Sequence, residues 1–165
     1  MACIYNDILP RNKKLVLIVI VAVAISVFIV VYREVNWQFE VSPDMILAAG
    51  EKQYKGERGA YGVTTVFGGG FGADVIYVPP REVATVEKGS EIELKVVNYW
   101  QPTEIDLYLR TYPESQETGL QLNKLSSYKY LVDIPQGDYE LLVFAKWEKL
   151  GGSASAYYNF RIIVS

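Results

Sequence analysis

Histidine is absent from this chain of 165 residues, and cysteine occurs once, as Cys3. Without histidine, the chain cannot form a Ser-His-Asp or Cys-His catalytic arrangement, and it lacks the commonest ligand of zinc and copper. A blue-copper site would need histidine and cysteine together, and neither occurs after residue 3. The sequence therefore predicts a protein that is not an enzyme and that has no metal and no cofactor.

The scarcity of cysteine also limits how the chain is stabilised. No disulfide can form after Cys3, so the remainder depends on packing alone. The sequence contains no Asn-x-Ser/Thr acceptor for N-linked sugars. Extracellular domains of animal cells often carry disulfides or such sugars, and the two absences together favour a prokaryotic cell envelope.

A strong charge of one sign is missing as well. The 16 basic and 19 acidic residues give a net charge of −3, and the two signs are interspersed along the chain. A phosphate backbone is bound by clustered basic residues, and the sequence has no such stripe. We therefore expect no nucleic acid among the partners.

One long apolar segment is present, from Leu15 to Tyr32, and only Ser26 interrupts it. Fourteen of its residues are Leu, Ile, Val or Phe. As a helix the segment would be about 27 Å long, close to the thickness of a hydrocarbon core. In lipid the backbone must satisfy its own hydrogen bonds, so even a segment rich in β-branched residues forms a helix there. The sequence predicts one transmembrane helix that binds membrane lipid.

The flanking charges predict the orientation of that helix. Arg11, Lys13 and Lys14 precede it closely, whereas Arg33 behind it is followed at once by Glu34. Positive charges accumulate on the cytoplasmic side, so the N-terminus should be cytoplasmic and the rest extracytoplasmic. The predicted divisions are a cytoplasmic segment 1–14, a transmembrane helix 15–32, a short linker 33–36 and an extracytoplasmic domain 37–165.

Two processing routes compete with an uncleaved anchor. Ala22-Val23-Ala24 has the form of a signal-peptidase site, but mainly large apolar residues continue after it, and such sites normally end the apolar region. Lipoprotein processing needs a cysteine at the end of the apolar run, whereas Cys3 precedes the positive charges. Retention of the helix is the better prediction.

Beyond the helix, the apolar pattern has the period of strands. In 91–96 the apolar side chains alternate with charged ones, and a turn at Pro135-Gln136-Gly137-Asp138 leads into an apolar run. Many short strands between Gly and Pro turns are typical of two packed sheets. We therefore predict an all-β, immunoglobulin-like antiparallel β-sandwich after the transmembrane helix. The predicted strands are 37–41, 59–67, 74–78, 81–86, 91–96, 105–110, 128–132, 139–147 and 158–164.

Several of these elements follow one another in an order found elsewhere. They are Gly59-Ala60-Tyr61, Pro79-Pro80, Gly89-Ser90-Glu91-Ile92-Glu93-Leu94, Pro135-Gln136-Gly137-Asp138-Tyr139 with Trp147, and Tyr158-Asn159-Phe160-Arg161-Ile162-Ile163-Val164. The order resembles the immunoglobulin-like extracytoplasmic domains of small uncharacterised lipoproteins and single-pass membrane proteins of Gram-positive bacteria. The chain departs from the lipoproteins because it has a membrane helix in place of a lipidated cysteine. The resemblance implies a fold and a cell-membrane location, and no catalytic residue.

Aromatic residues are abundant, with 13 tyrosines and three tryptophans. In a domain rich in strands such residues pack in the core and across neighbouring strands. The alternative is a tyrosine-rich outer face that binds a partner.

A glycine-rich segment lies between two predicted strands. The pattern G-x-G-x-x-(G/A) fits it from Gly68 to Ala73, but a phosphate-binding loop needs a helix after the glycines, and a strand pattern follows instead. We therefore predict a hairpin or exposed loop, which could contact a partner because glycines allow close backbone approach. The residues of this contact loop are Phe67, Gly68, Gly69, Gly70, Phe71 and Gly72.

Pairs of carboxylates occur at Glu91 with Glu93 and at Asp133 with Asp138. Such pairs serve in glycoside cleavage or calcium binding, but solvated charges on a strand and turn-forming aspartates explain them more simply. No particular serine and lysine stand out as a catalytic dyad.

These observations favour a non-enzymatic binding or accessory module of the cell envelope. Its expected partner is an envelope or membrane protein, and it could be a subunit of a larger membrane complex. A pilin-like filament subunit is an alternative, although Lys14 is followed by Leu15 where prepilin processing needs a small residue. An enzyme or a receptor for a small ligand is a third hypothesis.

Overall fold

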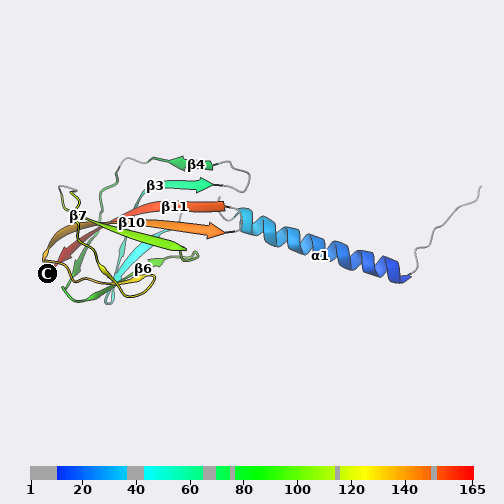
Figure 1. Ribbon diagram of the computed structural model, residues 1–165, viewed down its shortest axis with the longest axis horizontal. Helices are drawn as coiled ribbons and strands as arrows, with labels where there is room; N and C mark the ends of the chain where they lie inside the picture. The colour runs from blue at the N-terminus through cyan, green and yellow to red at the C-terminus, as the bar shows by residue number, and fades with distance from the viewer. Residues whose placement is uncertain (1–10, 37–42, 65–69, 75–76, 114–115, 150–151) are drawn as a thin grey trace, which may run out of the picture.

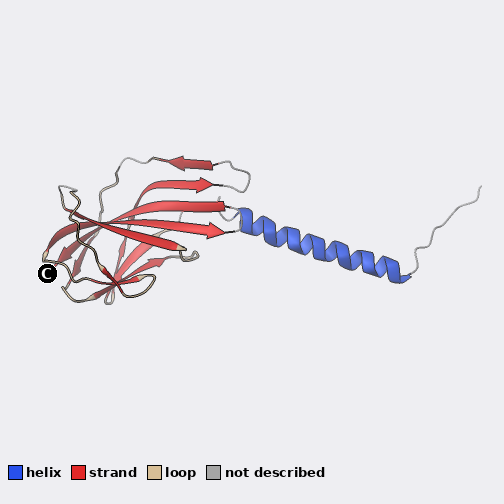
Figure 2. Ribbon diagram, viewed as in Figure 1, coloured by secondary structure: helices blue, strands red, loops and turns tan. Residues whose placement is uncertain are grey.

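The computed structural model describes the chain from residue 11 onward, except for residues 37–42, 65–69, 75–76, 114–115 and 150–151. One N-terminal helix, α1 (Arg11–Asn36), precedes a domain made of β-strands. The helix extends away from one end of this β-domain, and the C-terminus lies at the opposite end (Figures 1 and 2).

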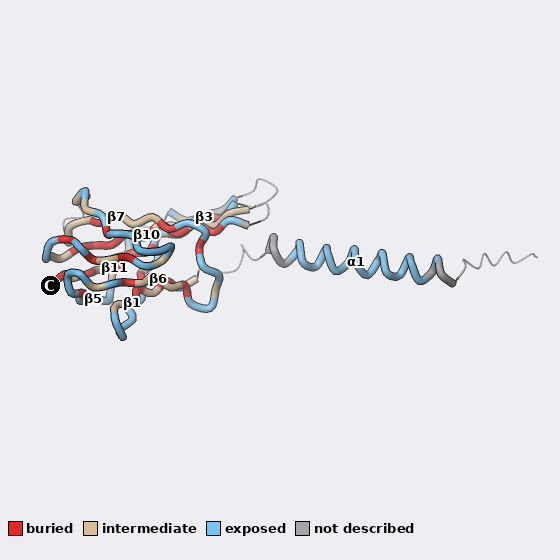
Figure 3. The backbone as a smooth tube through the Cα atoms, turned by 60° about the horizontal axis from the view of Figure 1, so that its bottom comes forward, coloured by how far each residue is buried: buried red, intermediate tan, exposed pale blue. Residues whose placement is uncertain are grey.

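Helix α1 has an apolar stretch, Leu15–Tyr32, that is long and apolar enough to cross a membrane. None of this stretch is buried inside the protein, in contrast to the strands (Figure 3). Within it, the Ser26 hydroxyl donates a hydrogen bond of 2.9 Å to the Ala22 carbonyl oxygen, so this group needs no outside partner. The helix continues to Asn36 and includes residues 33–36, which we expected to form a linker. An exposed apolar helix near an N-terminus serves as a signal-anchor or as a signal sequence.

The β-domain contains a five-stranded sheet in which all neighbouring strands are antiparallel. Its strands, in spatial order, are β2 (Lys52–Lys55), β1 (Met45–Ala49), β6 (Glu91–Val96), β9 (Lys129–Leu131) and β8 (Asn123–Lys124).

The second sheet has six strands and is built on a long hairpin. Strands β10 (Gly137–Lys149) and β11 (Gly152–Val164) contain 13 residues each and pair along their whole length. The order is β4 (Gly70–Ala73), β3 (Glu57–Thr64), β11, β10 and β7 (Glu104–Thr111). Strand β5 (Val83–Val86) pairs in parallel with the end of β11, and the other pairs are antiparallel.

The inner faces of the two sheets share one hydrophobic core. Leu47 and Leu94 from the five-stranded sheet are fully buried, as are Leu141 and Phe160 from the six-stranded sheet. Gly56 lies directly against the Phe160 ring, because an added Cβ atom would come within 2.5 Å of it. The prediction of an N-terminal apolar helix followed by a mostly β, sandwich-like domain is therefore confirmed.

Most predicted strands are confirmed, with shifted ends. The range 91–96 matches β6, and the alternate residues of β10 and β11 form the buried face that the pattern predicted. The mixed even positions of 139–147 indicated a central strand, and β10 does lie between β11 and β7. The prediction of a strand at 37–41 falls outside the described residues.

The predicted strand at 74–78 is wrong for its described residues. Asp74, Tyr77 and Val78 lie outside strands, and the pairing with β3 occurs earlier, in β4. The Val78 carbonyl oxygen instead accepts a hydrogen bond from the Asn159 side chain, so Val78 contacts a side chain of β11 and does not extend the sheet.

The β1–β2 hairpin and β8 were not predicted. Strand β1 is a run of apolar residues without period-two alternation, and it contains strong helix formers, so pattern alone does not indicate a strand. Gly50, with a φ of 59°, ends β1 and allows the tight turn into β2. That glycine after a short apolar run was the available signal.

Candidate functional site

The chain enters the β-domain at Pro43 and Asp44, beside a cleft of ≈ 680 Å³. The walls of this entry cleft come from the β1 entry, the β2–β3 connection and the segment after β6, and include Lys55, Arg58 and Tyr99. A volume of this size lies within the range of about 300–1,000 Å³ that is usual for ligand pockets. The cleft is therefore the first candidate site.

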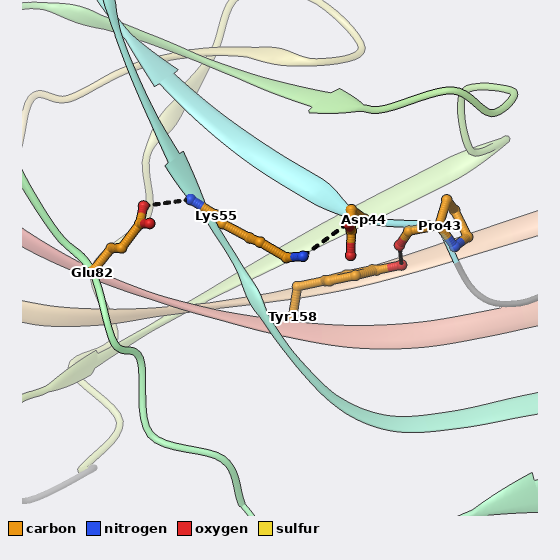
Figure 4. A network of polar contacts seen from close by, with 5 residues as sticks. All are labelled: Pro43, Asp44, Lys55, Glu82 and Tyr158. Carbon is orange, nitrogen blue, oxygen red and sulfur yellow. Dashed lines mark hydrogen bonds and ion pairs between the residues drawn. The ribbon is translucent and has the colours of Figure 1, made fainter.

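A polar network holds the entry point in place, as Figure 4 shows. The Lys55 ammonium lies 2.8 Å from the Asp44 carboxylate, and the Lys55 backbone N–H donates a 2.8 Å hydrogen bond to Glu82. The Tyr158 hydroxyl donates a 2.6 Å hydrogen bond to the Pro43 carbonyl oxygen. These contacts connect the entry segment to both sheets, because Lys55 belongs to β2 and Tyr158 to β11.

Three of the charged groups that line the entry cleft, Asp44, Lys55 and Glu57, lie in ion pairs. Besides the Asp44–Lys55 pair, Arg81 lies 3.4 Å from the Glu57 carboxylate. Burial raises the pKa of Tyr158, Arg58 opposes that shift and Asp44 adds to it. Tyr158 therefore remains a protonated donor at neutral pH and does not act as a base.

This arrangement is suited to binding polar groups. A catalytic base or nucleophile needs a neighbour that activates it, and Asp44, Lys55 and Glu57 are each held by a counter-ion. Among the residues that the structure describes, no group of three or more His, Cys, Asp or Glu side chains could hold a metal ion.

A second candidate site is the outer face of the six-stranded sheet, the face of β7, β10 and β11 that points away from the core. Two polar side chains on it are unusually buried, since Glu140 is 1% exposed and Asn159 is 3% exposed. The segment 77–82, which we call the strap, contacts both of them, through Tyr77 at Glu140 and through Val78 at Asn159. The Asn159 side-chain amide donates a 3.1 Å hydrogen bond to the strap carbonyl of Val78.

Arginine side chains flank the buried carboxylate. Glu140 lies opposite Arg110 of β7 and Arg161 of β11 in the strand register. Arg161 binds Asp138 through two hydrogen bonds of 3.1 and 2.6 Å, and its guanidinium carbon lies 3.9 Å from the centre of the Tyr112 ring. These residues form a polar cluster on the outer face.

Burial and hydrogen bonds within the polar cluster shift the pKa values of some of its ionisable groups. Burial, followed by the hydrogen bond with Glu140, raises the pKa of Tyr77. The hydrogen bond with Asp138 raises the pKa of Arg161. Within the described part of the chain, Asn159 Oδ1, Arg110 Nε and Thr111 Oγ1 are buried without a hydrogen-bond partner. Such atoms normally bind ordered water in a folded protein.

Beside the polar cluster lies an aromatic patch, formed by Tyr108, Leu142, Phe144 and Tyr157. Tyr108 lies opposite Leu142, and Phe144 lies opposite Tyr157, with ring centres 4.9 Å apart. Tyr108 is 46% exposed and Tyr157 is 37% exposed. Exposed tyrosines are therefore present on the outer face of this sheet, and binding of a partner through them stays a prediction.

The predicted contact loop is described only in part. Phe67, Gly68 and Gly69 lie outside the described residues, while Gly70, Phe71 and Gly72 belong to β4. An added Cβ atom at Gly72 would come within 2.6 Å of the Tyr61 carbonyl oxygen. Gly72 is therefore explained by close pairing with β3, and a role of this segment in partner contact stays a prediction.

Three of the four carboxylates paired in the sequence, Glu93, Asp133 and Asp138, have basic partners in the structure. Glu93 lies 2.9 Å from Lys95 on the outer face of the five-stranded sheet. Asp133 lies 3.9 Å from Lys88, whereas Asp138 binds Arg161. Glu91 and Glu93 line one small pocket of ≈ 210 Å³ on the five-stranded sheet together with Lys95 and Lys129, whereas Asp133 and Asp138 have separate basic partners.

The polar cluster and the aromatic patch were not assigned from the sequence. The one sequence feature that pointed to them was the mixture of polar and apolar residues at the even positions of β10, namely Glu140, Leu142 and Phe144. This mixture indicated a strand with both faces covered. That pattern does not reveal which distant residues cover the second face.

No protein-family model matches this chain, and no characterised protein or solved structure matches it. The function is therefore inferred from the helix, the entry cleft and the outer face.

Proposed function

We propose that this chain is a membrane-anchored binding module of the cell envelope, with no catalytic activity of its own. Helix α1 would span the cell membrane, with the N-terminus in the cytoplasm and the β-domain outside. The partner would be another envelope or membrane protein, bound by the β-domain. The observation that carries this proposal is the exposed apolar helix, which leads within a few residues into a two-sheet domain.

The absence of catalytic activity is supported by the chemistry of the candidate sites. The chain has no histidine, and Asp44, Lys55 and Glu57 of the entry cleft are held in ion pairs. Exposed aromatic side chains on a sheet are typical of protein-binding surfaces. A binding role uses these features, whereas a hydrolytic role would need an activated nucleophile.

We also propose that the sandwich is of the immunoglobulin-like kind. The support is a core shared by two sheets whose neighbours are almost all antiparallel, together with a long terminal hairpin in the centre of one sheet. An experimental structure whose strands connect in an order other than that of immunoglobulin-like sandwiches would contradict this assignment.

The topology can be tested with cysteine labelling, because the chain has a single cysteine. In intact cells a membrane-impermeant maleimide should leave Cys3 unlabelled. In a Cys3→Ser background, Ser165→Cys should be labelled, since this terminal residue is exposed. Labelling of both cysteines only after the cells are opened would contradict an external β-domain.

Binding can be tested by cross-linking intact cells with a membrane-impermeant amine reagent and isolating the chain under denaturing conditions. We expect one discrete adduct with another protein. As a matched control, α1 is replaced by an unrelated apolar helix of the same length, and the adduct should persist because the β-domain makes the contact. Recovery of free monomer alone would contradict the proposal. Loss of the adduct with the exchanged helix would instead place the contact in the membrane, as in a larger membrane complex.

A further inference from the structure

The surroundings of the aromatic patch differ in charge from the rest of the outer face. Strand register places Asp106 opposite Phe144 and Glu104 opposite Lys146, next to the patch in the direction of the β10–β11 connection. Glu148 follows on the same face and pairs with Lys146. We call Glu104, Asp106 and Glu148 the acidic rim.

The acidic rim carries an excess of negative charge. Among the described side chains that flank the patch toward the β10–β11 connection, Lys146 is the basic one, and Glu148 holds it. The hydrogen bond and the charge of Glu148, with Glu104 adding, raise the pKa of Lys146. The patch thus combines exposed aromatic rings with neighbouring carboxylates whose charge is only partly compensated.

We propose that the aromatic patch and its acidic rim bind an extended basic segment of the partner protein, in which lysine or arginine alternates with apolar residues. This inference rests on the proposed function and specifies its surface. Apolar side chains of the segment would pack on Phe144 and Leu142. Its cations would lie over Tyr108 and Tyr157, whose ring faces attract positive charge, and beside the carboxylates of the rim.

Two other occupants fit the charges less well. A second copy of this chain, bound through the same patch, would bring two acidic rims together, and like charges oppose such a contact. An anionic lipid surface would be repelled by the rim for the same reason. A basic protein segment is the occupant that the rim attracts.

The direct test uses the full chain in nanodiscs of neutral lipid and a labelled ten-residue peptide that alternates lysine with valine. A peptide that alternates glutamate with valine is its counterpart, and empty nanodiscs give the background. Fluorescence anisotropy should show binding of the lysine peptide, at least tenfold tighter than binding of the glutamate peptide. Equal binding of the two peptides would overturn the inference, and so would binding of anionic vesicles that depends on Tyr108 and Tyr157.

Matched variants assign the binding to this surface. Glu104→Gln with Asp106→Asn should weaken binding of the lysine peptide about fivefold or more, because two attractive charges are removed. Glu91→Gln with Glu93→Gln makes the same change in net charge on the five-stranded sheet and should alter binding less than twofold. Tyr108→Ala with Tyr157→Ala should weaken binding about tenfold or more, as for aromatic anchors in interfaces. Equal losses from the two pairs of charge variants would overturn the inference.

In cells, a photoreactive residue in place of Tyr108 should form the same adduct as the amine reagent. The same residue in place of Leu125, which is also exposed, serves as the control and should not form it. If the amine reagent gives an adduct and position 108 does not, this inference fails while the proposed function stands. If neither reagent gives an adduct, the proposed function itself fails.

Discussion

The outer faces of the two sheets differ in whether their polar side chains are solvated or buried. On the five-stranded sheet, Glu91, Glu93 and Lys95 alternate with buried apolar residues and face solvent, where Glu93 pairs with Lys95. On the six-stranded sheet, Glu140 and Asn159 occupy the corresponding outward positions but are buried, and aromatic side chains are exposed beside them.

This difference in burial indicates that the two outer faces have different roles. A solvated charged face keeps a domain soluble and contributes little to stability. A buried carboxylate lowers the stability of the fold unless the groups around it are arranged to bind it. The strap and the polar cluster provide that arrangement together, so they form one structural unit. The outer face of the six-stranded sheet is thus specified in detail, whereas that of the five-stranded sheet only needs to be polar.

The largest effect should come from removing the buried carboxylate. Glu140→Ala removes the carboxylate that Tyr77 hydrogen-bonds and leaves Arg110 opposite a site that has lost its negative charge, so we expect a loss of about 3 kcal/mol in the free energy of unfolding. The matched change Glu93→Ala, in a solvated ion pair, should cost less than about 0.5 kcal/mol. Urea unfolding of the full chain in detergent, followed by tryptophan fluorescence, measures both. Equal losses would break the distinction between the two faces.

Removing the hydrogen bond between β11 and the strap should have an intermediate effect. Asn159→Ala loses the bond to the Val78 carbonyl oxygen, which should lower the free energy of unfolding by about 1–2 kcal/mol. Amide hydrogen exchange should become faster in the strap, residues 77–82, and stay unchanged in β1. Asn123→Ala, at an exposed position of the five-stranded sheet, is the control and should change neither quantity.

A smaller effect should appear at alkaline pH. The pKa of Tyr77 is raised above its ordinary value of 10.0, so its contribution to stability is complete below pH 10 and is lost as the pH rises above that value. Tyr77→Phe should therefore make the alkaline fall in stability less steep. Tyr158→Phe should do the same, because burial raises the pKa of Tyr158 on the inner face. Urea unfolding at pH 8 to 11 gives the slopes, and a Tyr77→Phe slope equal to that of the unmodified chain would contradict the assignment.

The smallest effect on stability should come from the aromatic patch. Tyr108 is nearly half exposed, so Tyr108→Ala should change the free energy of unfolding by only about 0.5 kcal/mol. Its effect on partner binding should be much larger than its effect on unfolding. A loss of several kcal/mol on unfolding would instead make Tyr108 a structural residue.

The sequence predicted those parts of the fold that depend on local pattern. The apolar run of α1, the alternation in β6 and the paired strands of the β10–β11 hairpin were all visible, because periodicity reports which side of an element is buried. Strand β1 was missed because its helix-forming residues become a strand only through pairing with β2 and β6. The parallel pairing of β5 with β11 joins residues far apart in the chain and has no local signal.

The candidate sites depend even more on distant contacts. Tyr77, Arg110 and Glu140 carry no motif in common, and only the path of the strap brings the first of them to the other two. The glycines at 70 and 72 drew attention as a binding loop, but their spacing reflects close pairing of β4 with β3. Charge on the outer faces could be counted from the sequence, whereas its burial could not.

The hydrogen bond from Tyr158 to Pro43 has a mechanical consequence. If α1 spans a membrane, as we propose, a pull on it would reach the β-domain at Pro43 and Asp44, ahead of the first strand. There the force divides, because the Asp44 carbonyl oxygen accepts a bond from the Val97 N–H in one sheet, while Pro43 is held by β11 in the other. Tension would therefore load the 13-residue hairpin together with β1 and would not peel β1 away alone.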